Sequence, residues 1–413
     1  MTEKRCDPRT TKPIALGTGL SHREGPVLDV VCERPDLRRH LERPWFRAYL
    51  RRQLGAECLT EKPRSRQALL SEEALGRHTL LCGASGGGKT YCLAHLAMQQ
   101  VQAGASLVLL DGKGETCDLM APLLQAVGLP AEDLIILDPR SPEGVPGFNP
   151  LAAGVPVAQA AADLVALTLP DSVPGYRMRD LLTNALIVIG GQGLTLMELV
   201  RFLLKDEYRL ALLRRPATAS GGVAYDEAAL FFRDEFDCWT PSARLQGVAA
   251  VLNKLREYLR SDFLAGMLSA RQNQLDLARL FQKRTAILAR LDRASLGEEG
   301  MRLLSGLLAH LVFRTALRAS GPVPTVLSID ELPVIERAVG SVIADTLEVG
   351  RSQNLRLLVA CQHLDQLSDR LRASLFANAA IQIFMRLSPA DARLAAGALA
   401  AGAAPVVTRV VVS

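Results

Sequence analysis

The sequence predicts an α/β protein with a mainly parallel sheet and an inserted all-α domain. Three observations predict it. From residue 77 onward, short apolar runs alternate with helical stretches, and a phosphate-binding motif, GASGGGKT, stands between the first run and its following helix. Residues 139–284 have almost no strand signal. With 413 residues, 49% of them hydrophobic, the chain can bury a large core in two or three domains.

The expected strands are short apolar runs bounded by turn or helical sequence. Apolar runs of this length are typical of the buried strands of a parallel sheet, which are covered on both faces. The runs are 78–83, 105–110, 134–138, 285–291, 325–330, 356–361, 380–386 and 405–412.

The middle of the chain has the periodicity of helices instead. Successive amphipathic patterns predict helices over 156–168, 178–190, 194–205, 224–236 and 243–260. We therefore expect an all-α insertion domain at 156–279, inside a nucleotide-binding domain made of residues 71–155 and 280–413.

Residues 1–70 form a basic N-terminal segment, with 15 Lys and Arg against 9 Asp and Glu. Within it, residues 43–54 (RPWFRAYLRRQL) predict an amphipathic helix. Such a helix packs on its own domain more often than it lies on a membrane or a partner, and both other roles stay open. The role of the whole segment is open as well.

Composition excludes several classes of protein. The most apolar long stretch, 181–204, contains Asn184, Gln192, Glu198 and Arg201, so we expect no transmembrane segment. The first 15 residues are too polar for a signal peptide. Eight cysteines without a C-x-x-C pair argue against zinc and against a disulfide framework. We expect a cytoplasmic protein, and any peripheral attachment to the inner membrane would come through partners.

The motif GASGGGKT predicts a nucleoside triphosphate site for ATP. Its glycines let the backbone approach a phosphate at the start of a helix. Lys89 would reach the β- and γ-phosphates, and the Thr90 hydroxyl would bind Mg²⁺. The expected ATP-binding residues are Gly83, Ala84, Ser85, Gly86, Gly87, Gly88, Lys89, Thr90 and Tyr91.

A second half of the site is expected where the run 325–330 ends. Asp330 would hold Mg²⁺ through water, and Glu331 would polarise the attacking water. This neighbouring acid favours hydrolysis over binding alone. A kinase would also need an acceptor pocket, and none is evident in the sequence.

Two more polar residues stand at the ends of expected elements. Gln362 follows the strand 356–361, where it could sense the γ-phosphate or align water. Arg351 ends the preceding helix and could serve a neighbouring subunit as an arginine finger. An arginine there also complements the helix dipole without any such role.

Several short motifs together resemble the type IV secretion coupling-protein family, the TraG/TraD-like conjugative ATPases of the HerA/FtsK superfamily of DNA pumps. They are DGKGE at 111–115, FNPL at 148–151, the stretch from Gly350 to Gln362, and that from Asn378 to Arg386. The resemblance covers roughly residues 75–400. The sequence departs from the family in lacking N-terminal transmembrane helices, so a partner would supply any anchor, or the chain is nearer to soluble HerA-type pumps.

The resemblance implies a RecA-like core that assembles as a homo-hexameric ring, with nucleotide between subunits and DNA in the central channel. It implies that Gln362 is the glutamine sensor and Arg351 the arginine that acts in the neighbouring subunit. Partners would be single-stranded or backbone-read DNA, and a relaxase or secretion-channel components.

The leading hypothesis is an ATP-hydrolysing ring motor that translocates or couples DNA, such as a relaxase-bound strand, in conjugation or mobile-element transfer. One alternative is a coupling ATPase with protein cargo. Another is a nucleotide-controlled scaffold with negligible turnover, which Glu331 disfavours.

Overall fold

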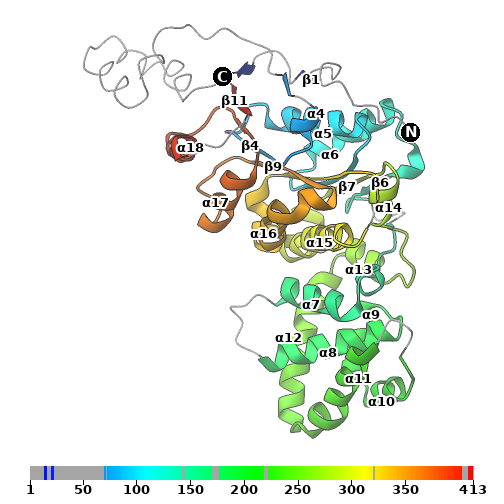
Figure 1. The fold of residues 1–413 in the computed structure, drawn as a ribbon. Coiled ribbons are helices and arrows are strands. Elements are labelled where there is room, and N and C mark those ends of the chain that lie inside the picture. The colour runs from blue at the N-terminus through cyan, green and yellow to red at the C-terminus, as the bar shows by residue number, and fades with distance from the viewer. Residues whose placement is uncertain are drawn as a thin grey trace, which may run out of the picture.

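The computed structural model describes residues 14–15, 20–22, 69–70, 72–141, 145–169, 176–217, 222–319, 321–401 and 408–412. Its main feature is a nine-stranded sheet in the order β2-β11-β10-β4-β9-β8-β5-β7-β6 (Figure 1). The strands are β2 (Leu20–His22), β4 (Thr79–Cys82), β5 (Ser106–Asp111), β6 (Leu134–Leu137), β7 (Ala286–Arg290), β8 (Thr325–Asp330), β9 (Leu355–Cys361), β10 (Ile381–Phe384) and β11 (Thr408–Val412).

Seven neighbouring strands, from β10 to β6, are all parallel, and β11 extends them in the same direction. Only β2, at the edge, is antiparallel among the strands of this sheet that the structure describes. All eight strands expected from the sequence are present, and the α/β fold class is confirmed. A separate small pair joins β1 (Ile14–Ala15) to β3 (Leu69–Leu70).

Helices cover both faces of the sheet. On one face lie α5 (Lys89–Gln102) and α6 (Glu115–Ala126), whose apolar sides share a core with alternate strand residues such as Leu81 and Leu109. The other face, with Leu80 and Leu110, packs against α15 (Arg293–Ala316), α16 (Leu332–Val349) and α17 (Asp369–Asn378). Because both faces are buried, the strands have the continuous apolar sequences on which their prediction depended.

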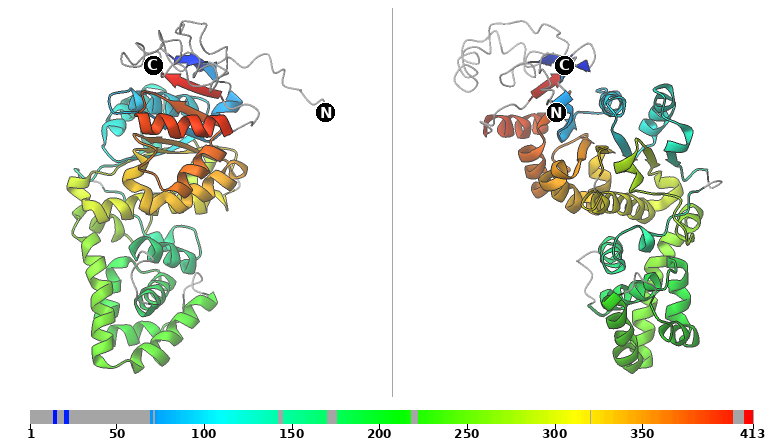
Figure 2. Two further views of the ribbon diagram at one scale, coloured as in Figure 1. Left: turned by 90° about the vertical axis from the view of Figure 1, so that its left-hand side faces the viewer. Right: turned by 45° about the vertical axis from the view of Figure 1, so that its right-hand side comes forward.

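Between β6 and β7, the part of the chain that the structure describes contains helices and loops but no strand. Most of its helices form a layer beyond α15 and α16, so the molecule is elongated in Figure 2. The α-helices between β6 and β7 are α7 (Val157–Thr168), α8 (Tyr176–Gly191), α9 (Leu196–Leu204), α10 (Asp206–Leu213), α11 (Gly222–Leu230), α12 (Pro241–Leu259), α13 (Asp262–Leu268) and α14 (Arg279–Gln282).

The helical layer joins the rest of the molecule through one long helix, α15. A Cβ atom at Gly306 would lie 2.3 Å from Leu167 Cδ2, and one at Gly300 would lie 2.9 Å from Leu264 Cδ1. Two glycines therefore allow α7 and α13 to approach α15 closely. The buried core is continuous from the sheet through α15 into the layer.

The entry to the helical segment and its exit are pinned together by the FNPL residues. The N–H of Asn149 donates to Asn273 Oδ1 at 2.5 Å, and Asn149 Oδ1 accepts from Leu151 N at 3.1 Å. Phe148 N donates to Met267 O at 2.7 Å. This motif thus has a clear structural role: it fixes where the inserted helices leave the sheet and return to it.

The described chain also contains α4 (Glu72–Leu75), α18 (Pro389–Ala401) and the 3-10 helices η2 (Ala131–Asp133), η3 (Pro150–Ala152) and η6 (Gly350–Gln353). The helix expected over 224–236 is interrupted, since α11 ends at Leu230 and a π-turn and a 3-10 turn follow. The helix expected over 43–54 lies outside the described residues. Among the described helices, none alone is long and apolar enough to cross a membrane, and one pair bent by 117°, Arg177–Gly191 with Leu196–Leu204, meets those criteria jointly.

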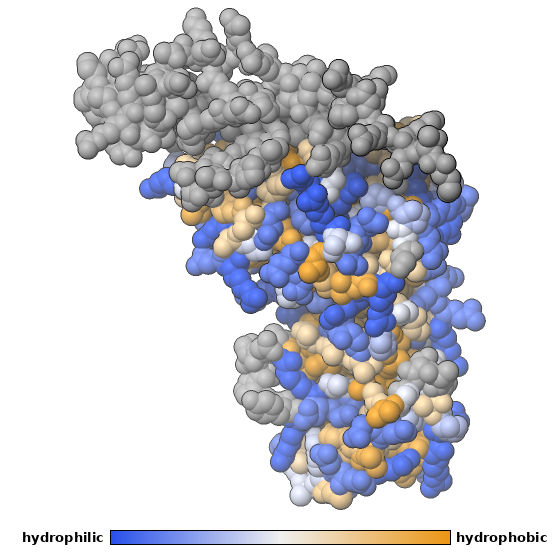
Figure 3. Space-filling model, viewed as in Figure 1, coloured by the Kyte–Doolittle hydropathy of each residue, from blue (hydrophilic) through white to orange (hydrophobic). Residues whose placement is uncertain are grey.

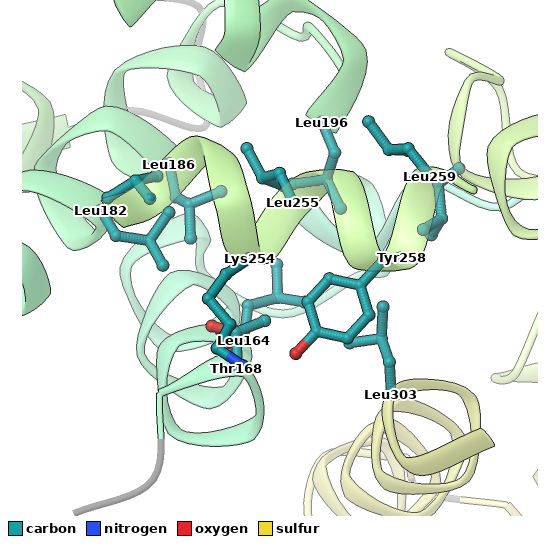
Figure 4. Close-up of a pocket in the computed structure, with 12 residues that line it drawn as sticks. Leu164, Thr168, Leu182, Leu186, Leu196, Lys254, Leu255, Tyr258, Leu259 and Leu303 are labelled. Atoms are coloured by element: carbon teal, nitrogen blue, oxygen red, sulfur yellow. Dashed lines mark hydrogen bonds between the residues drawn. The ribbon is translucent and has the colours of Figure 1, made fainter. Parts of the chain in front are cut away.

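The helical layer encloses a small apolar cavity of about 20 Å³ (Figure 4), with room for about one water molecule. Leucines from six helices line most of it, among them Leu164, Leu186, Leu255 and Leu303. The face shown in Figure 3 is mostly hydrophilic, and its hydrophobic residues form separate patches.

Candidate nucleotide site

The expected site residues, apart from Arg351, gather at one edge of the sheet. Strands β4, β9, β8 and β5 are neighbours and parallel, so their carboxyl ends lie side by side. The phosphate loop follows β4, Gln362 follows β9, and Asp330 ends β8. Asp111, which ends β5, is the register partner of Asp330. This edge of a parallel sheet is where ligands bind in open α/β proteins.

The glycines of the phosphate loop have the conformations that the motif requires. Gly86 and Gly88 have φ values of 74° and 84°, in the left-handed region. A Cβ atom at either position would meet nothing within 4 Å, so the space above the loop is open. At Gly83, by contrast, a Cβ atom would lie 2.6 Å from Met385 Cβ, which excludes a side chain there.

Backbone hydrogen bonds to the two neighbouring strands hold the loop in place. Gly83 N donates to Cys361 O at 3.2 Å, at the end of β9, and Ala84 N donates to Arg386 O at 2.6 Å, just after β10. The loop is therefore anchored to β9 and to the segment after β10, on the two sides of β4.

Lys89 lies inside this loop with 7% of its surface exposed, and its Nζ donates to Ala84 O at 3.1 Å. Burial lowers the pKa of Lys89, and the nearby Glu331 carboxylate opposes that shift. An ammonium group, an open glycine loop and the free N–H groups of a helix start suit a polyphosphate. The residues present thus fit a nucleoside triphosphate.

Asp330 is buried at the end of β8 and accepts a hydrogen bond of 2.6 Å from the Thr116 hydroxyl. Burial raises the pKa of this carboxyl group, and the neighbouring Asp111 raises it further, whereas the Thr116 bond lowers it. Carboxylate and hydroxyl oxygens are the ligands that Mg²⁺ prefers. Asp330 together with Thr90, at the start of α5, therefore fits a magnesium ion.

Glu331 has an unusual backbone. Its φ is 65°, in the left-handed region, which costs a residue other than glycine about 1–3 kcal/mol. Its carboxylate is held by Gln362, whose Nε2 donates to Oε2 at 2.6 Å and whose N–H donates to Oε1 at 3.3 Å. The structure therefore brings Glu331 and Gln362 into direct contact, at the C-terminal ends of adjacent strands.

The DGKGE residues add groups whose positions the sequence did not predict. Asp111 is fully buried, and its side chain accepts from the N–H groups of Lys113, Gly114 and Cys117 at 2.7–2.9 Å. It therefore shapes the turn that begins α6. Lys113 Nζ forms an ion pair with Glu331 Oε2 at 3.0 Å. The adjacency of β5 and β8, which this contact needs, cannot be read from the spacing of motifs.

A buried carboxylate also fixes the segment after Gln362. Asp391, at the start of α18, accepts from Leu364 N at 2.8 Å and from the Ser388 hydroxyl at 2.7 Å, and it contacts His363 Nδ1 at 3.1 Å. It ties the end of β9 to the segment after β10. The same segment supplies the carbonyl of Arg386 to the phosphate loop.

Arg351 does not join the site within one chain. It is exposed, in η6, and precedes β9, whereas Gln362 follows β9. The seven residues of that strand separate the two by about 20 Å, at about 3.3 Å per residue. Its positive charge instead acts on His78, at the opposite edge of the sheet. Its expected role in a neighbouring subunit stays a prediction.

Comparisons with known proteins were made at the level of sequence and at the level of fold. Residues 57–134 match the family model described as the helicase HerA-like C-terminal domain. No curated protein matches the sequence.

Solved structures show the same fold. The plasmid coupling protein TrwB in complex with the ATP analogue ADPNP is 18% identical, with a TM-score of 0.52, over 75% of this chain and 70% of that one. TrwB with ADP and Mg²⁺ gives 17% and 0.51 over the same shares. VirB4 of Thermoanaerobacter pseudethanolicus is 15% identical, with a TM-score of 0.51, over 81% of this chain and 86% of that one.

Proposed function

We propose that this chain, which matches a HerA-like family model in part and has the fold of the plasmid coupling protein TrwB and of VirB4, is an ATP-hydrolysing motor that moves DNA during conjugation. One observation carries the proposal: the phosphate loop, Asp330, Glu331 and Gln362 converge at one edge of the sheet. A scaffold that only binds nucleotide would have no need of a strained, buried glutamate beside the phosphate site.

In this proposal the loop Gly83–Thr90 and Tyr91 bind ATP, with Lys89 on the β- and γ-phosphates. Thr90 and Asp330 hold Mg²⁺, which supplies neutralisation of the phosphate charge when it is bound. Glu331 polarises the attacking water, and Gln362 aligns it. The fit of these groups to a polyphosphate and a hard cation supports the assignment.

The proposed assembly is a homo-hexameric ring with nucleotide between subunits. Arg351 from a neighbour would then stabilise the charge that develops on the γ-phosphate, which is consistent with its exposed position away from its own phosphate loop. Residues 71–155 and 280–413 would form the motor domain, and residues 156–279 an insertion domain that faces cargo or a partner such as a relaxase or a channel component.

DNA would be contacted through its backbone, so binding should depend strongly on salt and little on sequence. The test is ATP hydrolysis by the purified protein at low salt, alone and with single-stranded or double-stranded DNA. We expect stimulation by DNA that is lost as salt rises. A hexamer that hydrolyses ATP but ignores both DNA forms would exclude the DNA motor and favour a protein cargo.

A further inference from the structure

Residues that follow the two strands flanking β8 donate hydrogen bonds to the carboxylate of Glu331. Gln362, after β9, donates to Oε2 at 2.6 Å, and Lys113, after β5, donates to the same oxygen at 3.0 Å. Oε1 receives only the longer bond of 3.3 Å, from Gln362 N. Two strong donors therefore fix one oxygen and leave the other more available.

The backbone of Lys113 is itself held in place by hydrogen bonds. Its N–H donates to Asp111 Oδ1 at 2.9 Å, and Gly114 N donates to the same oxygen at 2.7 Å. Gly114 has a φ of 85°, and a Cβ atom there would overlap the Arg290 guanidinium. The turn that presents Lys113 is thus set by a buried aspartate and a required glycine.

Charge explains why Glu331 needs this ammonium. Glu331 follows Asp330, and Asp111 is the register partner of Asp330, so three carboxylates occur at the ends of β5 and β8. Its side chain is 7% exposed, whereas that of Lys113 is 46% exposed. Lys113 can neutralise the buried carboxylate while its own ammonium group stays partly hydrated. The desolvation penalty of the lysine in this ion pair is therefore small.

We propose that Lys113 is a positioning residue for hydrolysis: its ammonium holds Glu331 Oε2, so that the carboxylate faces the phosphate loop in one orientation. The proposal rests on the ATPase activity proposed above. Lys113 touches neither nucleotide nor water in this role, and it acts only through Glu331.

The test compares Lys113→Met and Lys113→Arg with the wild-type protein, in steady-state ATP hydrolysis and in equilibrium binding of a non-hydrolysable ATP analogue. We expect kcat of Lys113→Met to fall about 10- to 100-fold, the effect of a group misplaced by about 1 Å. The analogue Kd should change less than about twofold, and Lys113→Arg should recover most of kcat. Lys254→Met is the matched control, because Lys254 forms a 3.0 Å pair with Glu257 in the helical layer, and it should leave both constants unchanged.

A double-mutant cycle separates positioning from general damage. In a Glu331→Gln background, Lys113→Met should lower kcat no further, because the group on which Lys113 acts is already lost. A further loss there, a Kd raised about tenfold or more, or a kcat of Lys113→Met within about twofold of the wild type overturns the positioning role. Absence of hydrolysis by the wild-type protein overturns the proposed function and this inference with it, whereas wild-type hydrolysis with an unaffected Lys113→Met overturns this inference alone.

Discussion

At the scale of single residues, Glu331 combines a strained backbone with an expected role in hydrolysis. A φ of 65° is less favourable for a glutamate than for a glycine, so the backbone of Glu331 is strained. Three hydrogen-bond donors, one from Lys113 and two from Gln362, hold its carboxylate and offset that strain. Strain that is fixed by neighbouring contacts is found most often at functional sites, and here it orients a carboxylate beside a phosphate loop.

The first prediction concerns this carboxylate. Glu331→Gln should lower ATP turnover about 100-fold or more, because an amide cannot accept the proton of the attacking water. ATP binding should persist, since the phosphate loop is unchanged. The measurement is turnover beside equilibrium ATP binding, with Glu348→Gln, exposed on the same helix, as control. Equal turnover in Glu331→Gln and wild type would show that hydrolysis does not use this residue.

The second prediction concerns His78, which is buried and accepts a hydrogen bond from Leu357 N at 3.0 Å. Burial, and then the charge of Arg351, lowers its pKa from 6.5 to about 4. Below pH 6.5 the unfolded chain takes up a proton that the folded chain excludes, so stability is full above pH 6.5 and falls toward pH 4.

The measurement is the free energy of unfolding in urea at pH 7 and pH 5. Over this interval the wild type should lose about 2 kcal/mol more than His78→Gln, which keeps an acceptor but does not titrate. The same acid sensitivity in both proteins would assign the loss to other groups.

Sequence reasoning located the residues of the site that belong to local motifs. The loop Gly83–Thr90 and the pair Asp330–Glu331 each follow an apolar run, and parallel strands bring such ends together. The partners of Glu331 were harder to predict. Contact with Lys113 depends on β5 lying next to β8, and strand order is decided by packing of the whole sheet rather than by any short motif.

At the scale of elements, buried strands were the most predictable feature because both of their faces are covered by helices. The prediction of a helix over 224–236 was wrong at its C-terminal end, because the α-helix stops at Leu230. There Phe232 packs edge-on against Phe202, Phe231 and Phe236, with ring centroids 4.8, 5.2 and 5.3 Å apart. A periodic pattern shows that such rings are buried, but the break from α-helix to π- and 3-10 turns accompanies their mutual packing, which the pattern does not contain.

The third prediction tests the apolar cavity in the helical layer. Leu186 is 2% exposed and lines this cavity, so Leu186→Ala should enlarge a space that already exists. We expect a loss of about 3–5 kcal/mol in the free energy of unfolding, because the cost rises with the volume left empty. Leu245→Ala, at a leucine that is 71% exposed, is the control. Equal losses at the two sites would mean that the cavity closes on truncation.

At the scale of the whole molecule, the fourth prediction tests the proposed ring. Lys89→Ala should abolish ATP hydrolysis, and so should Arg351→Ala if each site takes its arginine from the neighbour. In a mixture of the two variants, an Arg351→Ala subunit supplies an intact phosphate loop and a Lys89→Ala subunit supplies an intact arginine.

Mixed rings should therefore regain activity, up to about a quarter of the wild-type value if subunits mix at random and sites act independently. ATP hydrolysis after unfolding and reassembly of the two variants together measures it, with each variant reassembled alone as control. Full activity of Arg351→Ala by itself, in an assembled ring, would remove this arginine from the site.

Strand β9 acquires a particular meaning in such a ring. It lies between β4 and β8, with Gln362 at its carboxyl end and Arg351 just before its amino end. One end would face the subunit's own nucleotide, and the other would point to the nucleotide of the next subunit. Strand β9, which is hydrogen-bonded to a neighbour on each side, would then transmit a change in nucleotide state from one subunit interface to the next. Sequential ATP hydrolysis around a ring would need a physical link between neighbouring nucleotide sites. In this chain that link would be a single buried strand.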